Sequence, residues 1–289
     1  KSAPNNTLTY KVLSGNDAGM FELSAAGKLS VAKNTLDFEK VASYTLTVQV
    51  SDAGTPSHKD TAIVKISVLD VNEKPVVSDA SYSVEENTAA GLVLGTLVAT
   101  DPDKSAPNNT LTYKVLSGND AGMFELSAAG KLSVAKNTLD FEKVASYTLT
   151  VQVSDAGTPS QKDTAIVKIS VLNVNEKPVV SDASYSVEEN TAAGLVLGTL
   201  VATDPDKSAP NNTLTYKVLS GNDAGMFELS TAGNLTLVSD SLDFERVASY
   251  TLTVQVSDAG TPSLKDTAIV KISVLDVNEK PEIADASYS

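Results

Sequence analysis

Acidic residues recur along this chain in short motifs that contain neither His nor Cys. The motifs read LDFE, DVNEKP with one NVNEKP variant, and DPD followed shortly by Asn, and single acids recur within VEEN and SDAG. Mixed carboxylate, amide and carbonyl oxygens suit a hard cation. Calcium takes about six to eight oxygens in a loose geometry, whereas magnesium prefers fewer protein ligands. We therefore predict calcium sites built from these motifs.

The candidate calcium ligands fall into five groups, one for each motif. In LDFE they are Asp37, Glu39, Asp140, Glu142, Asp243 and Glu245. In the NEKP motif they are Asp70, Asn72, Glu73, Asn173, Asn175, Glu176, Asp276, Asn278 and Glu279. In DPD and the following Asn they are Asp101, Asp103, Asn108, Asp204, Asp206 and Asn211. In VEEN they are Glu86 and Glu189, and in SDAG they are Asp155 and Asp258.

Other interpretations of these acids explain the pattern less well. A solvated, solubilising surface would not require the same positions to recur together. Paired carboxylates such as Asp101 and Asp103 could serve a glycosidase, but an array does not usually copy an active site into every repeat. The chain has no Ser-His-Asp set, phosphate-binding loop or nucleophile elbow, and its single His58 is replaced by Gln161 and Leu264 at the matching positions. We therefore predict that the segment is not an enzyme.

The motifs recur because the chain repeats itself every 103 residues, with Lys1, Lys104 and Lys207 each opening the text KSAPNNTLTYKVLSGNDAGMFELS. Residues 1–75 match 104–178 except that His58 becomes Gln161 and Asp70 becomes Asn173. A fixed period of domain length indicates an array of whole domains. We expect an N-terminally shortened domain at 1–75, complete domains at 76–178 and 179–281, and the start of a further repeat at 282–289.

Composition restricts the class of partner. The net charge is −14, from 22 basic and 36 acidic residues. This balance argues against nucleic acid, which requires clustered Lys and Arg, and fits a soluble protein or one that collects cations. The chain has no Cys, so neither disulfides nor thiolate metal sites contribute to its stability.

Short alternating runs in residues 76–178 predict β-strands. They read SYSVEE, LVLGTLVAT, TLTYKVL, MFEL, KLSV, YTLTVQVS and TAIVKISVL. Period-two alternation indicates a strand with one buried and one wet face. Gly130 and the run SDAGTPSQKD are typical of hairpin connections. Seven short strands without a helical period predict an all-β, antiparallel β-sandwich.

The repeats meet at a proline. Pro75, Pro178 and Pro281 each follow the last predicted strand of a repeat. Proline cannot continue a sheet ladder, and it stiffens the connection. Only about five residues separate that strand from the next repeat, which is too short for a flexible tether.

The chain resembles the cadherin repeat family. The matching motifs are VEENTAAG, AT-DPD, NNTLTY, LDFE, YTLTVQVSDAG and VL-DVNEKP, which occur in the family's order and cover essentially the whole chain. The resemblance implies tandem seven-stranded Greek-key, immunoglobulin-like sandwiches in an elongated array. It also implies calcium ions between successive domains. The upper domain would give the VEEN glutamate and LDFE, the linker the NEKP motif, and the lower domain DPD, the Asn carbonyl and the SDAG aspartate.

Carried across residue by residue, the resemblance defines two junctions. The first junction comprises Asp37, Glu39, Asp70, Asn72, Glu73, Asp101, Asp103, Asn108 and Asp155, and we expect it to be weaker or altered because its VEEN glutamate would precede Lys1. The second junction comprises Glu86, Asp140, Glu142, Asn173, Asn175, Glu176, Asp204, Asp206, Asn211 and Asp258. Seven of these are carboxylates, and three divalent ions would nearly cancel their charge.

Three residues depart from the family's usual linker, DxNDNxP. Glu73 can still ligate an ion but reaches farther, and Lys74 offers only its backbone carbonyl while placing a positive charge nearby. Asn173 removes one negative charge from the second junction. These departures bear on affinity and ion number. Extracellular sites of this chemistry often have dissociation constants of about 10⁻⁴–10⁻³ M.

Two functions are compatible with the sequence. The first is a calcium-rigidified extracellular spacer of a large surface or secreted adhesin, supporting cell adhesion or biofilm attachment. The near-identical copies and the absence of Cys suggest a bacterial source. The alternative is a module that binds carbohydrate or other copies of the array through a face of each repeat. The low aromatic content, 5%, argues against carbohydrate platforms, and no Trp is present for exchange of a Trp-bearing strand.

Overall fold

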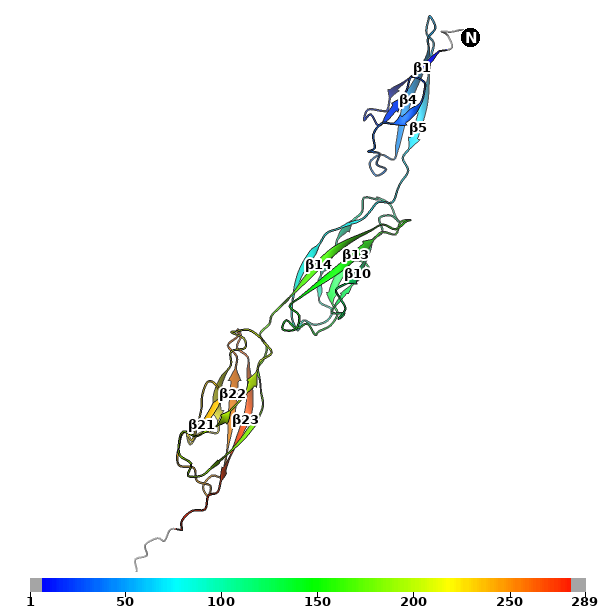
Figure 1. Ribbon diagram of the computed structural model, residues 1–289. Helices are drawn as coiled ribbons and strands as arrows, with labels where there is room; N and C mark the ends of the chain where they lie inside the picture. The colour runs from blue at the N-terminus through cyan, green and yellow to red at the C-terminus, as the bar shows by residue number, and fades with distance from the viewer. Residues whose placement is uncertain (1–6, 282–289) are drawn as a thin grey trace, which may run out of the picture. The chain divides into compact units, whose positions relative to one another are not determined.

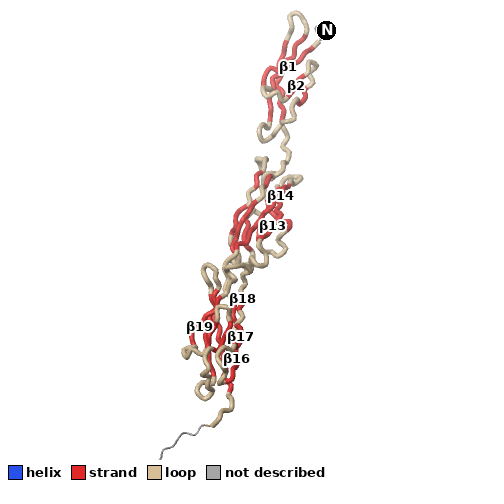
Figure 2. Tube along the Cα trace, turned by 60° about the vertical axis from the view of Figure 1, so that its left-hand side comes forward, coloured by secondary structure: helices blue, strands red, loops and turns tan. Residues whose placement is uncertain are grey.

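The computed structural model describes residues 7–281, so the predicted start of a further repeat at 282–289 lies outside the described residues. The chain divides into two compact units. One comprises residues 1–84, 88–138 and 146–170, and the other comprises 85–87, 139–145 and 171–289. Each junction defined above therefore lies within a single unit. Among the described residues the structure consists of strands and loops (Figure 2).

The third repeat shows the complete architecture within one unit. Its strands are β15 (Val179–Val180), β16 (Ala183–Glu188), β17 (Val196–Thr199), β18 (Ala202–Thr203), β19 (Thr215–Ser220), β20 (Phe227–Leu229), β21 (Asn234–Leu237), β22 (Ser249–Ser257) and β23 (Lys265–Leu275). One sheet has the order β16-β23-β22-β19 and the other β17-β21-β20, with β15 and β18 forming a short pair. The strands β21, β22 and β23 are labelled in Figure 1. The predicted all-β sandwich is confirmed.

The core of this repeat lies between its two sheets. Leu252, Val254 and Val256 alternate along β22 and are fully buried, as are Leu235 and Leu237 on β21. Their neighbours on β22, such as Thr253, remain partly exposed. The alternation read from the sequence therefore corresponds to the two faces of the strands, and the apolar face holds together the sheet from which the acidic loops project.

The structure adds two details to the sandwich. The strand β16 runs parallel to β23, with Tyr185 opposite Ile272, whereas the sequence predicted antiparallel pairing throughout. Alternation identifies the faces of a strand but not its direction. Both strands run from the incoming linker of the repeat toward its outgoing one, so they pair in parallel.

The second detail is that the run LVLGTLVAT forms two strands in each complete repeat. In the third repeat, Leu200 and Val201 separate β17 from β18. Leu200 is buried and donates its N–H to the carbonyl of Gly233 at 2.9 Å. After this residue, β18 pairs with β15 instead of continuing beside β21. The change from one sheet pairing to the other therefore takes place within two residues, the buried Leu200 and the exposed Val201.

The second repeat has the same strands in the same order. They are β6 (Val76–Val77), β7 (Ala80–Glu85), β8 (Val93–Thr96), β9 (Ala99–Thr100), β10 (Thr112–Ser117), β11 (Phe124–Leu126), β12 (Lys131–Val134), β13 (Ser146–Ser154) and β14 (Lys162–Leu172). Its sheets have the orders β10-β13-β14-β7 and β11-β12-β8. Gly130 lies in the connection from β11 to β12, and SDAGTPSQKD connects β13 to β14, as predicted.

The first repeat has fewer strands. They are β1 (Leu8–Ser14), β2 (Phe21–Leu23), β3 (Leu29–Val31), β4 (Ser43–Asp52) and β5 (Lys59–Ser67). They form the sheets β1-β4-β5 and β2-β3. The small cluster of Met20, Phe21, Leu46 and Val48 is its buried core.

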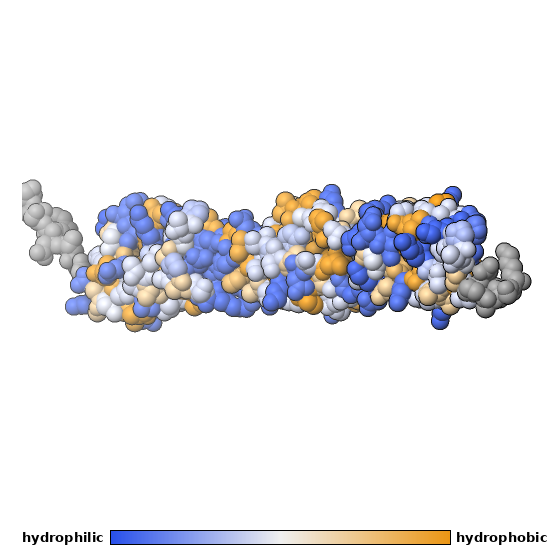
Figure 3. Space-filling view, turned by 90° about the horizontal axis from the view of Figure 1, so that it is seen from above, coloured by the Kyte–Doolittle hydropathy of each residue, from blue (hydrophilic) through white to orange (hydrophobic). Residues whose placement is uncertain are grey.

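The surface mixes polar and apolar residues. In Figure 3, hydrophobic residues are scattered among hydrophilic ones on the face in view, and the exposed apolar side chains come from many strands and loops. Scattered exposed apolar residues are normal for a soluble surface. Within the described residues, no helix is long and apolar enough to cross a membrane.

Candidate metal centre

The first junction gathers carboxylates from both adjoining repeats and from the linker. Oxygens of Glu39, Asp70 and Asp103 all lie within 4.8 Å of one another. Asp103 is only 3% exposed, although no basic side chain pairs with it within the described residues. Buried ionised carboxylates require a compensating charge, so this arrangement fits a bound cation.

The DPD loop is held in place by its own backbone. The N–H of Asp103 donates to Asp101 Oδ1 at 3.0 Å, and the linker N–H of Glu73 donates to Asp103 Oδ2 at 2.9 Å. Asn108 Nδ2 approaches Asp103 Oδ1 at 3.4 Å. The loop therefore contacts the linker directly, which is how a motif of the lower repeat comes to lie beside the acids of the upper one.

The SDAG loop accepts hydrogen bonds from the linker asparagine, Asn72. Asp155 is 4% exposed, and its Oδ1 accepts hydrogen bonds from the N–H groups of Gly157 and Gln161, both at 3.0 Å. Its Oδ2 accepts from Asn72 Nδ2 at 3.1 Å, and the same amide donates to the carbonyl of Pro159 at 2.8 Å. The linker is thereby attached to the lower repeat, with Asn72 Oδ1 left as a free acceptor.

Asn72 lies so close to Gly157 that the glycine has no room for a side chain. A Cβ built on Gly157 would lie 2.2 Å from Asn72 Oδ1, and the same holds at 2.1 Å for Gly260 and Asn175. No atom pair tolerates such a distance, so either the loop or the linker must move when a side chain is added. Neither glycine was singled out by the sequence, although its place in SDAG was visible.

We expect Gly157→Ala to destabilise the protein by about 1–3 kcal/mol, because it displaces Asn72 and costs the hydrogen bonds to Asp155 and Pro159. Thermal unfolding in chelator measures this effect. The matched control is Asn72→Ala, which removes the clashing amide. Gly157→Ala added to Asn72→Ala should cost much less than in the wild type, and equal costs in the two backgrounds would contradict the contact.

The second junction adds the VEEN glutamate. Glu86 is 3% exposed, and its carboxylate accepts the N–H of Phe141 and the linker N–H of Val174, both at 2.8 Å. Its oxygens lie within 4.8 Å of those of Asp140 and Glu142. The glutamate therefore connects LDFE to the linker, as the motif order predicts.

Asn87 is a junction residue that the sequence reasoning missed. Its φ of 57° is in the left-handed region, which Asn tolerates better than most residues. In this conformation its Nδ2 donates to Glu176 Oε1 of the linker at 3.0 Å. The Asn that follows the two glutamates was the available signal.

The other predicted ligands of the second junction repeat the geometry of the first. Asp206 accepts the N–H of Glu176 at 2.8 Å, and its own N–H donates to Asp204 Oδ1 at 3.0 Å. Asn175 donates to Asp258 at 3.2 Å and to Pro262 at 2.9 Å. These contacts of the linker with the lower repeat are therefore common to the two junctions.

At the far end of the third repeat, Glu189, Asp243 and Glu245 form a third acidic group within 4.8 Å. Glu189 accepts the N–H groups of Phe244 at 2.7 Å and Val277 at 2.8 Å. Asn190 donates to Glu279 at 2.8 Å. Asp276 and Asn278 are exposed. The further repeat predicted to begin at residue 282 lies outside the described residues.

Five buried oxygens in the junctions accept no hydrogen bond from any described residue. They are Asn72 Oδ1, Asp101 Oδ2, Glu142 Oε2, Asn175 Oδ1 and Asp204 Oδ2. Buried polar atoms are normally paired, and an unpaired one calls for an explanation. All five are oxygens and all belong to predicted ligands, so the donor set fits a hard cation.

The ionisation of the junction carboxyls reflects their crowding. Burial, and then the neighbouring Glu39 and Asp103 carboxylates, raise the pKa of Glu73, while burial raises the pKa of Asp101. Burial followed by the Glu86 carboxylate raises the pKa of Glu142, and burial raises the pKa of Asp204. Without a cation, these groups take up a proton more readily than ordinary carboxyls do.

Calcium should therefore bind more weakly at about pH 5 than at about pH 7, because ions and protons compete for the same oxygens. The sign follows from the raised pKa values of Glu73 and Glu142: as pH falls, these carboxyls take up protons before ordinary ones do. Calorimetric titration at the two pH values, in buffers of different ionisation enthalpy, measures both affinity and proton release. Equal affinities with no proton release would contradict this prediction.

Lysines occupy defined places around the junctions. Lys40 and Lys143 pair with Asp37 and Asp140 at 2.8 and 2.7 Å, and these hydrogen-bonded partners lower the pKa of both aspartates. Asp37 is not a member of the acidic group formed by Glu39 and its neighbours. Asp140 does belong to the group formed by Glu86 and Glu142, although it also pairs with Lys143.

The linker lysine, Lys74, pairs with Asp163 at 2.6 Å, and Asp163 also accepts the N–H of Val77. Its charge is thus engaged on β14 of the lower repeat. Lys104, from the lower repeat, donates to the backbone carbonyl of Glu39 in the upper one. Neither Asp163 nor Lys104 was identified from the sequence as a junction residue.

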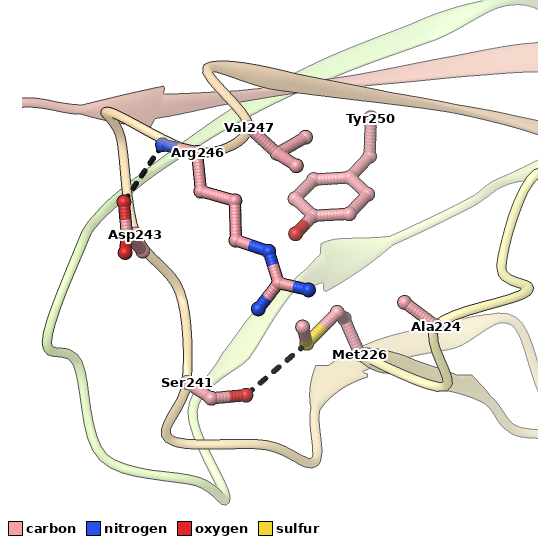
Figure 4. Close-up of a pocket in the computed structure, with 7 residues that line it drawn as sticks. All are labelled: Ala224, Met226, Ser241, Asp243, Arg246, Val247 and Tyr250. Carbon is pink, nitrogen blue, oxygen red and sulfur yellow. Dashed lines mark hydrogen bonds between the residues drawn. The ribbon is translucent and has the colours of Figure 1, made fainter.

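The third repeat differs beside its LDFE motif. A cavity of about 120 Å³ is lined there by Met226, Ser241, Arg246 and Tyr250, among others (Figure 4). Arg246 stands where the other repeats have Lys40 and Lys143. Its N–H donates to Asp243 at 2.7 Å, while its guanidinium extends toward Met226 and Ser241. Asp243 is therefore not engaged by a basic side chain as its counterparts are.

The comparisons with known proteins agree with this architecture. Residues 1–69, 80–172 and 183–275 match the Cadherin domain. The chain belongs to the cadherin family. This cadherin segment is 35% identical over 298 residues to human Protocadherin Fat 4, covering 99% of this chain and 6% of that protein. It is 36% identical over 299 residues to mouse Cadherin-related family member 2, covering 97% of this chain and 23% of that protein.

A solved structure matches nearly end to end. Mouse Cadherin-23 EC22-24 is 30% identical with a TM-score of 0.75, covering 96% of this chain and 89% of that one. The cadherin segment is extracellular. It spans about 6% of the length of the first curated relatives.

Proposed function

We propose that this segment is a calcium-binding extracellular spacer whose domains are held in a fixed relation by ions at their junctions. The observation that carries the proposal is the set of five buried, unpaired oxygens within the acidic junctions. Family membership supports the adhesion context. The proposed domains are residues 1–75, 76–178 and 179–281, with a further repeat beginning at 282.

Charge explains why the ions would stiffen the chain. The second junction assembles seven carboxylates, and two like charges about 4 Å apart repel by about 4 kcal/mol at an effective dielectric of about 20. Calcium would cancel most of this charge while bridging oxygens from the upper repeat, the linker and the lower repeat. The same side chains that separate the repeats without ions would then connect them.

The proposed ligands are chosen from those predicted from the sequence, according to where the structure places their oxygens. We assign Glu39, Asp70, Asp101, Asp103 and the unpaired Asn72 Oδ1 to the first junction. We assign Glu86, Asp140, Glu142, Asp204, Asp206 and the unpaired Asn175 Oδ1 to the second junction. Asp155 and Asp258 already accept several N–H groups, so their proposed role is to place the linker as well as to contribute charge.

The relatives named above are animal proteins. They support an adhesion spacer without supporting the bacterial source or the biofilm role that the near-identical repeats suggested. They likewise lend no support to a glycan partner. Association between copies of the array remains compatible with the family.

Isothermal titration of the segment with calcium, and separately with magnesium, tests the proposed function. We expect saturable calcium binding that is weakened by Asp103→Asn and by Asp206→Asn but not by Glu125→Gln, an exposed acid on β11. Binding heat that is absent, or equal in all variants, would contradict calcium binding at the junctions. Sedimentation of the calcium-loaded segment measures association between copies.

A further inference from the structure

The two junctions differ at one linker position. Residues 1–75 and 104–178 are otherwise nearly identical, yet Asp70 of the first linker is replaced by Asn173 in the second, and Asp276 follows in the third. The structure shows that this change alters which contacts cross the junction. It therefore divides the junctions of the array into two kinds.

In the first junction, the position is part of the acidic group. Asp70 contributes an oxygen to the group that Glu39 and Asp103 complete, all within 4.8 Å. Asn108, the nearby amide of the lower repeat, approaches only Asp103, at 3.4 Å. In this group, the carboxylates of the upper repeat and linker face each other without a donor between them.

In the second junction, two asparagine side chains form hydrogen bonds with the acidic residues of both repeats. Asn173 Nδ2 donates to Glu142 Oε1 of the upper repeat at 3.0 Å. Asn173 Oδ1 in turn accepts from Asn211 Nδ2 of the lower repeat at 3.4 Å, and the same amide donates to Asp206 Oδ1 at 3.1 Å. A continuous relay of side-chain contacts, Glu142–Asn173–Asn211–Asp206, thus joins the upper repeat to the lower one through the linker.

We propose that Asn173 makes the second junction partly independent of calcium, by replacing an ion-mediated bridge with this amide relay. The inference rests on the proposed function, since it assumes that the junction acids bind calcium. An Asn can still turn its Oδ1 toward an ion, but it adds no charge to the site. Compared with a junction that has Asp at this position, the second junction is accordingly more rigid without calcium, and calcium adds less to its rigidity.

The proposal separates the role of Asn173 from other differences between the junctions. The second junction also contains Glu86 and Asn87, which bind the linker at Val174 and Glu176, so a simple comparison of the two wild-type junctions is not decisive. The informative comparison changes only this position within each junction. The reciprocal substitutions Asn173→Asp and Asp70→Asn provide it.

Because the chain has no Cys, pairs of spin labels can be placed on introduced cysteines. Glu22, Glu125 and Glu228 are exposed and occupy matching positions on β2, β11 and β20. Labels on Glu22→Cys and Glu125→Cys report on the first junction, and labels on Glu125→Cys and Glu228→Cys report on the second. Pulsed dipolar spectroscopy in chelator and in excess calcium gives the width of each distance distribution.

We expect Asn173→Asp to broaden the second-junction distribution in chelator, since the relay loses its donor and gains a like charge. Excess calcium should restore a narrow distribution, with calcium affinity at this junction raised about threefold to tenfold by the added ligand charge. Asp70→Asn should narrow the first-junction distribution in chelator and lower the calcium affinity there. The control Gln152→Glu, which adds a charge opposite Lys114 in the middle of β13, should change neither.

Failure of the inference differs from failure of the proposed function. If Asn173→Asp leaves the width in chelator unchanged while calcium still narrows both distributions, the amide relay is refuted and calcium stiffening stands. If calcium narrows no distribution in any variant, both ideas are refuted. Broadening by Asn173→Asp in chelator that calcium reverses supports the proposal.

Discussion

Replacing Asp258 by Ala should destabilise the third repeat by about 2–4 kcal/mol even when calcium is removed. The buried carboxylate of Asp258 accepts the N–H groups of Gly260 at 2.9 Å and Leu264 at 3.0 Å, together with the amide of Asn175. Truncation leaves these donors without an acceptor in a buried loop, and each such donor costs about 1–3 kcal/mol. Denaturant unfolding in chelator, with and without the substitution, measures the loss.

The same substitution should also release the linker. Asn175 would keep only its bond to Pro262, so calcium affinity at the second junction should fall together with stability. Asp52→Ala is the matched control, because Asp52 accepts the N–H groups of Gly54 and His58 in the same loop of the first repeat. It should cost local stability without changing calcium binding at the second junction. Calcium affinity reduced equally by both substitutions would contradict a role for Asp258 in seating the linker.

Glu142→Gln should have opposite effects in the two states. In chelator we expect it to raise stability by up to about 1 kcal/mol, because it removes one of several crowded charges. Its Oε1 can still accept from Asn173, and its new amide would replace an oxygen that has no donor and would lie near the Glu86 carboxylate. The raised pKa of Glu142, caused by burial and then by Glu86, indicates that these surroundings disfavour its charged form.

In calcium, Glu142→Gln should be destabilising relative to the wild type, with affinity at the second junction lowered about tenfold or more because a charged ligand is lost. Thermal unfolding in chelator and in excess calcium gives both signs from one protein. Glu125→Gln, on the exposed face of β11, is the control and should move neither midpoint. A melting temperature lowered by Glu142→Gln in both states would mean that this carboxylate stabilises the fold for reasons unrelated to an ion.

The sequence predicted the sandwich because its signals are local. Strands such as β13 and β23 alternate cleanly, and turns such as that at Gly130 have residue types specific to them. The parallel pairing of β16 with β23 was not predictable in this way, since alternation carries no direction. The division of LVLGTLVAT at Leu200 and Val201 was likewise not predictable from alternation.

The candidate site was predictable as a set of motifs but not as a set of contacts. Motif order brought Glu86, the LDFE acids and the linker together by resemblance, and the structure places these groups close to one another. The roles of Asn87, Gly157 and Asp163 depend instead on backbone conformation and on residues more than 80 positions away along the chain. Such long-range contacts leave no local pattern that a single sequence reveals.

The most direct test of calcium stiffening is small-angle X-ray scattering of the segment, recorded in excess calcium and again after addition of a chelator. The account predicts that the calcium-loaded protein scatters as one extended particle of fixed shape. After chelation, the largest dimension should change and the profile should require an ensemble of conformations. Identical profiles in the two conditions would contradict the account, and would leave the junction acids a role in solubility alone.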